Sequence, residues 1–481
     1  MSDSIVRGTL YLGFAQGVAL LSMAAIHVLA ARYFGAETYG DFAVVLAILS
    51  LLTVTCLMGI PHAVSKFTAE NVRRASNILK KGLALQGGIA IVVAGVLYLT
   101  SNELSTFLGD TALATFLRIA AFALPATGLA LVYIHTLNGI RAFAKQAVAL
   151  GALNVFKMTG VLAFLFLGFG LEGAMLGIVC AAVATLLVSA ALCRGVQGGQ
   201  SFDTRRLTIF GAQLAITYLA VEIWTQADLL MLQILGTRSQ DVGLFGAVNT
   251  LRGVLDTIFL PLLIMLFPII AQYMAVGDAP VVAHYIKKCI TYVFLICSPL
   301  VVMTYFMGQD ILGMVYGSQY LMAAFAVAPL LMSTLFYILY EVLDTFIRGS
   351  GKAALSLWIA TGLLLAHLVL NWFLIPRYGL WGVVITNIVM SLVASLAAGI
   401  AVMQSLTLRI DWLSIGKILF CSLAVSVPFF LWQPDGGLGA LLMALLCFGL
   451  YLCLLVAWKV IDSEDISRVR DLGYMLRRAG P

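Results

Sequence analysis

Long apolar runs, separated by short polar connections, follow one another along nearly the whole chain. We distinguish about fourteen runs of 20 residues or more, the length at which a helix crosses roughly 30 Å of hydrocarbon. The runs are continuous rather than alternating, which favours helices over the strands of a membrane barrel. The pattern therefore predicts an all-α polytopic membrane protein with about 14 transmembrane helices. The runs lie near 8–32, 40–62, 82–101, 113–138, 146–169, 171–194, 207–235, 243–272, 289–308, 322–347, 354–375, 379–404, 415–433 and 437–460.

Composition supports a membrane protein and argues against a soluble one. Hydrophobic residues make up 62% of the 481 residues and charged residues only 10%, with a mean hydropathy of +1.04. A soluble domain carries about 25% charged residues. The net charge of +6 reflects basic loops at a membrane surface, and we expect no nucleic acid as a partner.

The basic residues are distributed unevenly between the two sets of connections. If the N-terminus lies in the cytoplasm, most of the 28 Lys and Arg residues fall on cytoplasmic segments, as the positive-inside rule requires. The first run lacks the pattern of a cleaved signal peptide, so we expect it to be retained. Both termini are then cytoplasmic. The densest basic clusters are Lys66, Arg73, Arg74, Lys80 and Lys81, and then Arg194, Arg205 and Arg206.

Two short motifs recur in the two halves of the chain. LAARYFGAETYGDFAV at 29–44 is echoed by QILGTRSQDVGLFGAV at 233–248, and FGLEG at 169–173 is echoed by YGLWG at 378–382. Each motif falls at a hinge between runs, where glycine permits left-handed turns and close packing. The chain is therefore predicted to contain a duplicated unit of six helices.

Because six is an even number, both copies enter the membrane from the same side. They are then related by a pseudo-two-fold axis along the membrane normal, with the substrate path between them. We expect an N-lobe at 1–200, a C-lobe at 201–408, two further helices at 409–461 and a cytoplasmic amphipathic basic tail at 462–481. The tail has apolar residues at helical spacing among arginines, as in helices that lie on a membrane surface.

The first hinge and the 6+6+2 arrangement resemble a known family of transporters. The hinge reads ARYFG at 31–35 and YGDF at 39–42. These residues, and the Gly-Leu-x-Gly hinges, are similar to the polysaccharide transporter branch (Wzx-type oligosaccharide flippases) of the multidrug/oligosaccharidyl-lipid/polysaccharide flippase superfamily. The resemblance implies a protein of the bacterial inner membrane that flips an undecaprenyl-pyrophosphate-linked oligosaccharide to the outer leaflet by alternating access. It also implies membrane lipids and other membrane proteins of polysaccharide assembly as partners, and we expect a monomer.

Charged residues inside the runs are candidates for substrate binding, because a charge inside a bilayer is costly. A pyrophosphate-linked glycan needs cations for its phosphates and polar groups for its sugars. Asn154 precedes Lys157 by about one helical turn, and Asn249 precedes Arg252 by the same spacing in the second half of the chain. The candidates for substrate binding are Lys157, Arg252, Arg118, Asn154, Asn249 and Glu222.

The three cations have structural alternatives. Arg252 and Asp256 are spaced to neutralise each other on one helix. Arg118 is close enough to the end of its run to reach the headgroups, whereas Lys157 lies near the bilayer centre. The acids Glu222, Asp228 and Asp256 balance the three cations by formal count. The interior therefore has no net positive charge, which departs from the basic cavity expected for a pyrophosphate.

The resemblance also implies a site for a coupling ion, Na⁺ or H⁺. Relatives use an acid of the seventh span with polar residues of the eleventh and twelfth. The matching residues are Asp228, Asn371 and Asn387, and the structural alternative is that Asp228 pairs with a basic residue. We expect no other cofactor and no bound metal. His27 and His367 lie within runs and are interpreted as packing residues.

Other classes of protein remain as alternatives. A cation-coupled multidrug exporter or a lipid II flippase would belong to the same superfamily. A membrane glycosyltransferase or polymerase needs a catalytic surface on long external loops, and the longest external connection, near 308–321, is short. We therefore expect a transporter rather than an enzyme, with no catalytic residues.

Overall fold

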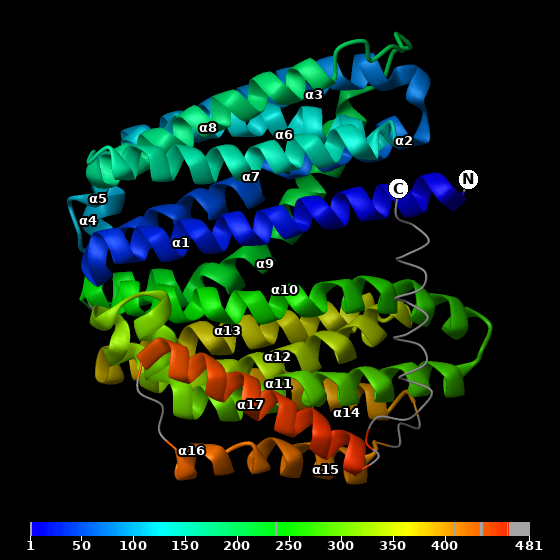
Figure 1. Cartoon of the computed structure of the whole chain (residues 1–481). Coiled ribbons are helices and arrows are strands. Elements are labelled where there is room, and N and C mark those ends of the chain that lie inside the picture. The colour runs from blue at the N-terminus through cyan, green and yellow to red at the C-terminus, as the bar shows by residue number, and fades with distance from the viewer. Residues whose placement is uncertain (1, 236–237, 407–409, 433–435, 459, 461–481) are drawn as a thin grey trace. The chain divides into compact units, whose positions relative to one another are not determined.

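The computed structural model describes residues 2–235, 238–406, 410–432, 436–458 and 460, and within these residues all regular structure is helical (Figure 1). The predicted tail at 462–481 lies outside the described residues. The helices are α1 (Ser2–Leu52), α2 (Gly59–Glu70), α3 (Ala75–Leu99), α4 (Ser101–Phe107), α5 (Leu113–Ala121), α6 (Ala123–Gly139), α7 (Phe143–Phe166), α8 (Gly170–Leu192), α9 (Thr204–Ile234), α10 (Ser239–Ala275), α11 (Ala279–Val315), α12 (Ala324–Gly349), α13 (Ala353–Tyr378), α14 (Leu380–Met403), α15 (Trp412–Ala424), α16 (Val427–Leu431) and α17 (Gly436–Ala457).

The described helices confirm the all-α membrane fold. Twelve are long and apolar enough to cross a membrane, and a thirteenth span is formed if the two parts of α9, which meet at a bend of 44°, are counted as one. The first of the twelve, Tyr11–Glu70, has 60 residues, about twice the length that one crossing needs. It bends at Gly35, which has a φ of 78°, so it accounts for two of the predicted runs.

The chain forms two compact units, whose bounds differ from those of the predicted lobes. Unit 1 comprises residues 1–250 with 368–383, and unit 2 comprises 251–367 with 384–481. The lobe boundary at 200/201 stays a prediction. Unit 1 contains α9 in addition to the first six predicted spans.

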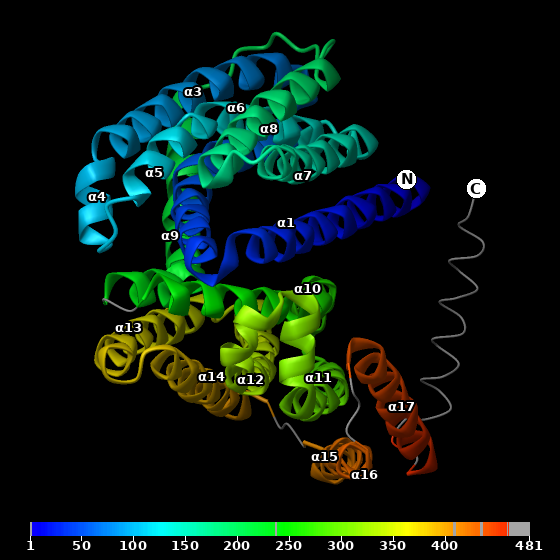
Figure 2. The same ribbon diagram turned by 60° about the vertical axis from the view of Figure 1, so that its left-hand side comes forward.

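In unit 1, helices α3, α6, α7 and α8 pack side by side (Figures 1 and 2). The contact between α7 and α8 is closest at Gly160 and Gly177, where a side chain on either residue would collide with the backbone of the other. Glycine at both positions therefore allows two hydrophobic helices to approach backbone to backbone, as in other membrane helix pairs.

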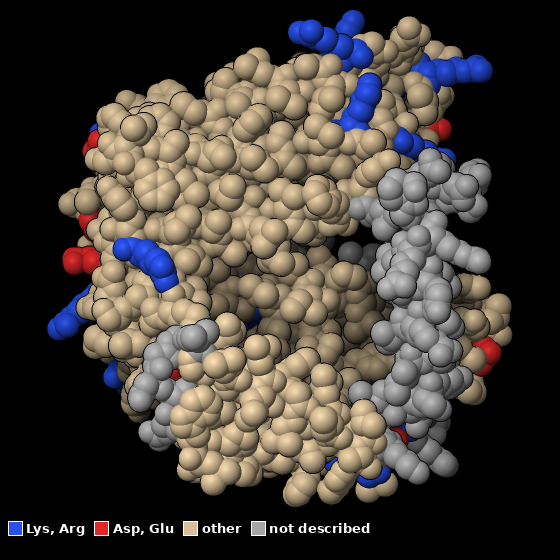
Figure 3. All heavy atoms as spheres, viewed as in Figure 1, with Lys and Arg blue, Asp and Glu red and all other residues tan. Residues whose placement is uncertain are grey.

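The two basic connections that were predicted on one side of the membrane are in direct contact within unit 1. The Lys81 ammonium donates to the Phe202 carbonyl at 2.5 Å, and the Gln200 amide donates to the Arg73 carbonyl at 3.4 Å. On the face shown in Figure 3, Lys and Arg side chains gather at one end of unit 1, and the surface between its ends carries few charges. This distribution agrees with the positive-inside prediction.

The two copies of the first repeated motif pack on each other in unit 1. A side chain at Gly40 would collide with the Ser239 carbonyl, and one at Gly243 would collide with the Ala36 carbonyl. The matching aromatic residues, Phe42 and Phe245, are both almost completely buried. The repeated glycines therefore allow the two hinges to meet, in addition to turning the chain.

The second repeated motif has the same backbone in both copies. Gly170 and Gly379 both adopt a positive φ, 61° and 54°, which favours glycine. Three residues later, a side chain at Gly173 would collide with Phe169, directly before α8, and one at Gly382 would collide with the Leu374 carbonyl of the preceding helix. The sequence echo thus corresponds to a repeated local structure.

In unit 2, α15 and α17 pack on α11. Their common core includes Met303, Met307, Cys421, Met443 and Cys447. The Tyr451 hydroxyl of α17 donates to the Leu295 carbonyl of α11 at 2.8 Å. The last two predicted spans are therefore packed against the body of unit 2.

Candidate functional site

Lys157 of unit 1 lies far from both ends of α7. By helical rise it is about 21 Å from the first residue of α7 and about 14 Å from the last. Its side chain is half-buried, and within the described residues it forms no hydrogen bond or ion pair. An ammonium group at this depth without a carboxylate is unfavourable, which is a property expected of a site that receives an anion.

Two side chains of α1 and α7 accompany Lys157. Lys157 is close enough to His27 of α1 for its charge to act on the imidazole. Asn154, about one helical turn before Lys157, donates its side-chain amide to the Leu150 carbonyl at 2.9 Å, which leaves its Oδ1 atom as an acceptor. The neighbourhood of Lys157 thus offers one cation, one imidazole and one carboxamide oxygen.

The acids of α9 accept hydrogen bonds from neutral side chains in unit 1. The Glu222 Oε1 atom accepts hydrogen bonds from Ser50 at 2.6 Å and from Gln226 at 2.9 Å. The Asp228 Oδ1 atom accepts from the Asn371 amide at 2.8 Å. Both carboxyl groups are buried, with 8% and 7% of each residue exposed. The structure therefore brings together Asp228 and Asn371, two of the three residues predicted to bind the coupling ion.

Arg118 has a structural environment at the end of unit 1. Its guanidinium donates to the Ser101 hydroxyl and to the Asn102 carboxamide, each at 2.8 Å, and it stands 5.9 Å from the centre of the Tyr98 ring. These contacts join α5 to the start of α4 and to the end of α3. A role for Arg118 in substrate binding stays a prediction.

Arg252 of unit 2 does not pair with Asp256, although the two are one turn apart on α10. The Arg252 guanidinium donates to the Asn387 Oδ1 atom at 2.7 Å and lies 5.8 Å from the centre of the Tyr337 ring. The Asp256 Oδ1 atom is buried without a hydrogen-bond partner in the described part of the chain. Asn387, the third residue of the predicted ion site, is thus bound to a guanidinium in unit 2. Asn249 is half-buried, one turn before Arg252.

Two further acids of unit 2 were missed by the sequence reasoning. Asp344 of α12 is 7% exposed and forms an ion pair with Arg348 at 2.7 Å, and Glu341 lies 3.6 Å from the same guanidinium. Both acids fall within the predicted run 322–347. They were overlooked because they lie near its end, where a charge is usually solvated.

The histidines are dispersed in the sequence, but two of them meet in unit 1. The rings of His62 and His135 have centroids 4.2 Å apart, and the Tyr218 ring lies 5.2 Å from His62. His62 also bonds the Met58 carbonyl through its Nδ1 atom at 2.8 Å. The described residues contain no group of three or more His, Cys, Asp or Glu suited to a metal ion.

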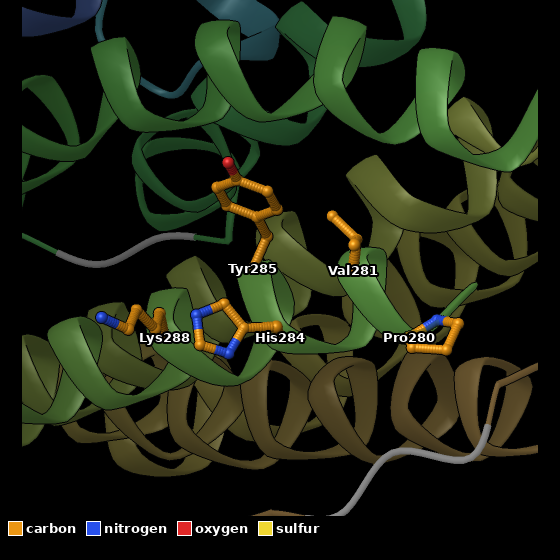
Figure 4. A pocket seen from close by; sticks show the side chains of 5 residues that line it. All are labelled: Pro280, Val281, His284, Tyr285 and Lys288. Atoms are coloured by element: carbon orange, nitrogen blue, oxygen red, sulfur yellow. The ribbon is translucent and has the colours of Figure 1, made fainter. Parts of the chain in front are cut away.

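A pocket of about 330 Å³ lies on the first turns of α11 in unit 2 (Figure 4). Its five lining residues fall on one helix face, and they are Pro280, Val281, His284, Tyr285 and Lys288. With 37 residues, α11 is about 55 Å long and exceeds the thickness of the hydrocarbon. The pocket is therefore remote along α11 from the middle of the membrane.

The helices and their intramembrane polar residues define a polytopic membrane transport protein. Residues 5–274, more than half of the chain, match the family model described as polysaccharide biosynthesis protein. The chain belongs to this family of polysaccharide biosynthesis proteins. Residues 214–373 also match the MatE family, and no curated protein matches the chain.

Solved structures share the fold at low sequence identity. The lipid II flippase MurJ, in an inward closed conformation, is 14% identical with a TM-score of 0.76, covering 94% of this chain and 99% of that chain. A mutant of the Vibrio cholerae MATE transporter VcmN is 14% identical with a TM-score of 0.59, covering 85% and 98%. An outward-facing MATE multidrug transporter is 16% identical with a TM-score of 0.59, covering 83% and 96%. These structures show a shared fold, while the family-model matches support the predicted membership of the multidrug/oligosaccharidyl-lipid/polysaccharide flippase superfamily.

Proposed function

We propose that this protein is a flippase that moves an undecaprenyl-pyrophosphate-linked oligosaccharide from the cytoplasmic to the outer leaflet of the bacterial inner membrane. The observation that carries the proposal is Lys157, a cation deep within α7 that has no carboxylate partner in the described residues. A phosphate oxygen would supply the missing negative charge. The family match to polysaccharide biosynthesis proteins and the fold shared with a lipid II flippase support a lipid-linked glycan.

The coupling ion, Na⁺ or H⁺, would bind at Asp228. Its carboxylate and the Asn371 Oδ1 atom, which is buried without a hydrogen-bond partner among the described residues, are oxygen ligands that suit a hard cation.

A translocation assay tests the proposal. Purified protein is reconstituted into liposomes with a fluorescent undecaprenyl-pyrophosphate oligosaccharide, and its exposure on the far leaflet is followed with and without a Na⁺ or proton gradient. We expect Lys157→Ala to lower the rate at least tenfold, a loss of about 1.4 kcal/mol. Lys145→Ala is the matched control, because Lys145 lies on the same helix but is exposed. Equal rates for Lys157→Ala and wild type would contradict the proposed site.

Alternating access requires that the two hinge motifs separate during the cycle. The backbone of Gly40 lies against that of Ser239 across these motifs, so the pair Asp41→Cys and Ser239→Cys should form a disulfide. Oxidation should stop translocation, and reduction should restore it, whereas each single variant should be unaffected by oxidant. Full transport by the oxidised double variant would exclude this movement.

A cation-coupled multidrug exporter is the second candidate. The MatE match over residues 214–373 and the MATE transporters among the similar structures favour it. In the same liposomes, efflux of small organic cations without translocation of any lipid-linked glycan would select the exporter.

A further inference from the structure

His27 and Lys157 lie on two helices of unit 1, α1 and α7, that pack together. His27 lies about 12 Å along α1 from the hinge at Gly35, and Lys157 lies about 14 Å along α7 from its last residue. α1 packs along α7, and both of these ends lie at the same end of unit 1 (Figure 1). Helical rise therefore places the two residues at a similar depth on neighbouring helices.

His27 is held by the first hinge motif rather than by Lys157. Its Nδ1 atom lies 2.8 Å from the Tyr39 hydroxyl, and its ring meets those of Tyr39 and Phe42 edge-on, with centroids 6.1 and 6.4 Å apart. Tyr39 and Phe42 are completely buried. The ring is therefore fixed in place, and its Nε2 atom makes no hydrogen bond within the described part of the chain.

The charged groups around His27 come from the helices packed against α1. On α7 the charged residue at a similar depth is Lys157. On α9 the acid Glu222 is bound by Ser50 and Gln226. Protonation of His27 would place a second cation near Lys157 in an apolar setting, where the two charges repel each other. Two phosphate charges bound between His27 and Lys157 would instead favour the protonated form of His27.

We propose that His27 and Lys157 together form a phosphate site whose occupation takes up one proton from the cytoplasmic solution. The inference rests on the proposed function. In the occupied site, the imidazolium donates its Nε2–H to a phosphate oxygen and its Nδ1–H to the Tyr39 hydroxyl, while Lys157 donates to the second phosphate. The proton supplies the positive charge that the formal count of intramembrane residues lacks. It also ties the charge of the site to Tyr39, a residue of the hinge motif.

Substrate binding at several pH values tests the inference. The probe is undecaprenyl-pyrophosphate oligosaccharide, and the full chain is held in lipid nanodiscs between pH 5.5 and 8.5. A pyrophosphate diester does not ionise in this range, so the pH dependence of the Kd reports on the protein. With one proton linked to binding, the Kd of the wild type should rise by up to about tenfold per pH unit on the alkaline side. Calorimetry in buffers of different ionisation enthalpy should count one proton per substrate.

His27→Gln is the informative variant, because glutamine can still bond the Tyr39 hydroxyl but cannot take up a proton. Its Kd should be independent of pH, and its proton count should be zero. His367→Gln is the matched control, since His367 is the other histidine predicted within a span and is 3% exposed; it should keep the slope of the wild type.

The outcomes separate the inference from the proposed function. If the Kd of His27→Gln depends on pH as that of the wild type does, or if the wild type takes up no proton on binding, the proton-linked site is wrong. The proposed flippase function is not contradicted by either result. If the wild type does not bind the substrate, or if Lys157→Ala binds it as tightly as the wild type, the proposed function itself fails.

Discussion

The intramembrane charges of unit 1 and unit 2 are satisfied in different ways. In unit 2, Asp344 and Arg348 form an ion pair, and Arg252 is held by Asn387 and Tyr337. In unit 1, Lys157 has no anionic partner among the described residues, and Glu222 is bound by neutral groups. Charges that are already bound stabilise a fold, whereas an unbound charge is available to a ligand. We therefore infer that Arg252 and the Asp344–Arg348 pair of unit 2 are structural and that Lys157 is functional.

The ion pair of unit 2 should show the largest effect on stability. In Arg348→Ala the Asp344 carboxylate stays buried without its cation, which should lower the free energy of unfolding by about 1.5–3 kcal/mol. Thermal unfolding in detergent measures the change. Adding Asp344→Asn should restore most of it, and Arg377→Ala, at an exposed position, should change nothing. If Arg348→Ala leaves the free energy of unfolding unchanged, the inference that this ion pair of unit 2 is structural is wrong.

Arg252→Met should have a smaller effect of the same kind. It removes the hydrogen bond to Asn387 and the contact with Tyr337, so we expect a loss of about 1–2 kcal/mol in stability. Translocation per folded molecule should remain within about twofold of the wild type, a change below 0.5 kcal/mol. The rate is normalised to the folded fraction from size-exclusion chromatography. If transport is lost while stability is kept, Arg252 contacts the substrate.

Glu222→Gln should be close to neutral for stability in unit 1. The carboxamide oxygen can still accept from Ser50 and Gln226, so we expect a change within about 0.5 kcal/mol. Glu222→Leu loses both hydrogen bonds and should cost about 1–3 kcal/mol. The two melting temperatures are compared in the same detergent. A large loss in Glu222→Gln would mean that the charge itself is bound by a cation.

The smallest effect should come from Asp411, a surface carboxylate of unit 2. The backbone amide of Ser414, which it caps at 3.1 Å, and the ammonium of Lys287 at 3.1 Å lower the pKa of the Asp411 carboxyl below its usual 3.8. Its contribution, about 1 kcal/mol for a helix cap, is therefore present at neutral pH and lost as the pH falls through the lowered pKa. The melting temperatures of the wild type and Asp411→Ala should differ at pH 6, and the difference should shrink as the pH falls through and below the lowered pKa. A constant difference would exclude this cause.

The sequence predicted the elements of the fold better than the partners of its polar residues. The hydropathy of the runs and the repeated glycines predicted the helices and the hinges, because both signals are local. The pairing of Asp228 with Asn371 was anticipated only through a family resemblance. Arg252 bonds Asn387, 135 residues away, rather than Asp256 on its own helix, and no local spacing predicts this contact. The meeting of His62 with His135 depends in the same way on how helices pack.

The most direct test compares Lys157→Met with Arg252→Met in one preparation, measuring translocation and thermal stability for both. Lys157→Met should abolish translocation while leaving stability equal or higher, because it removes an unpaired charge from the membrane interior. Arg252→Met should lower stability and retain translocation. If Lys157→Met unfolds the protein, or if it transports as the wild type does, Lys157 is not the cation that receives the substrate.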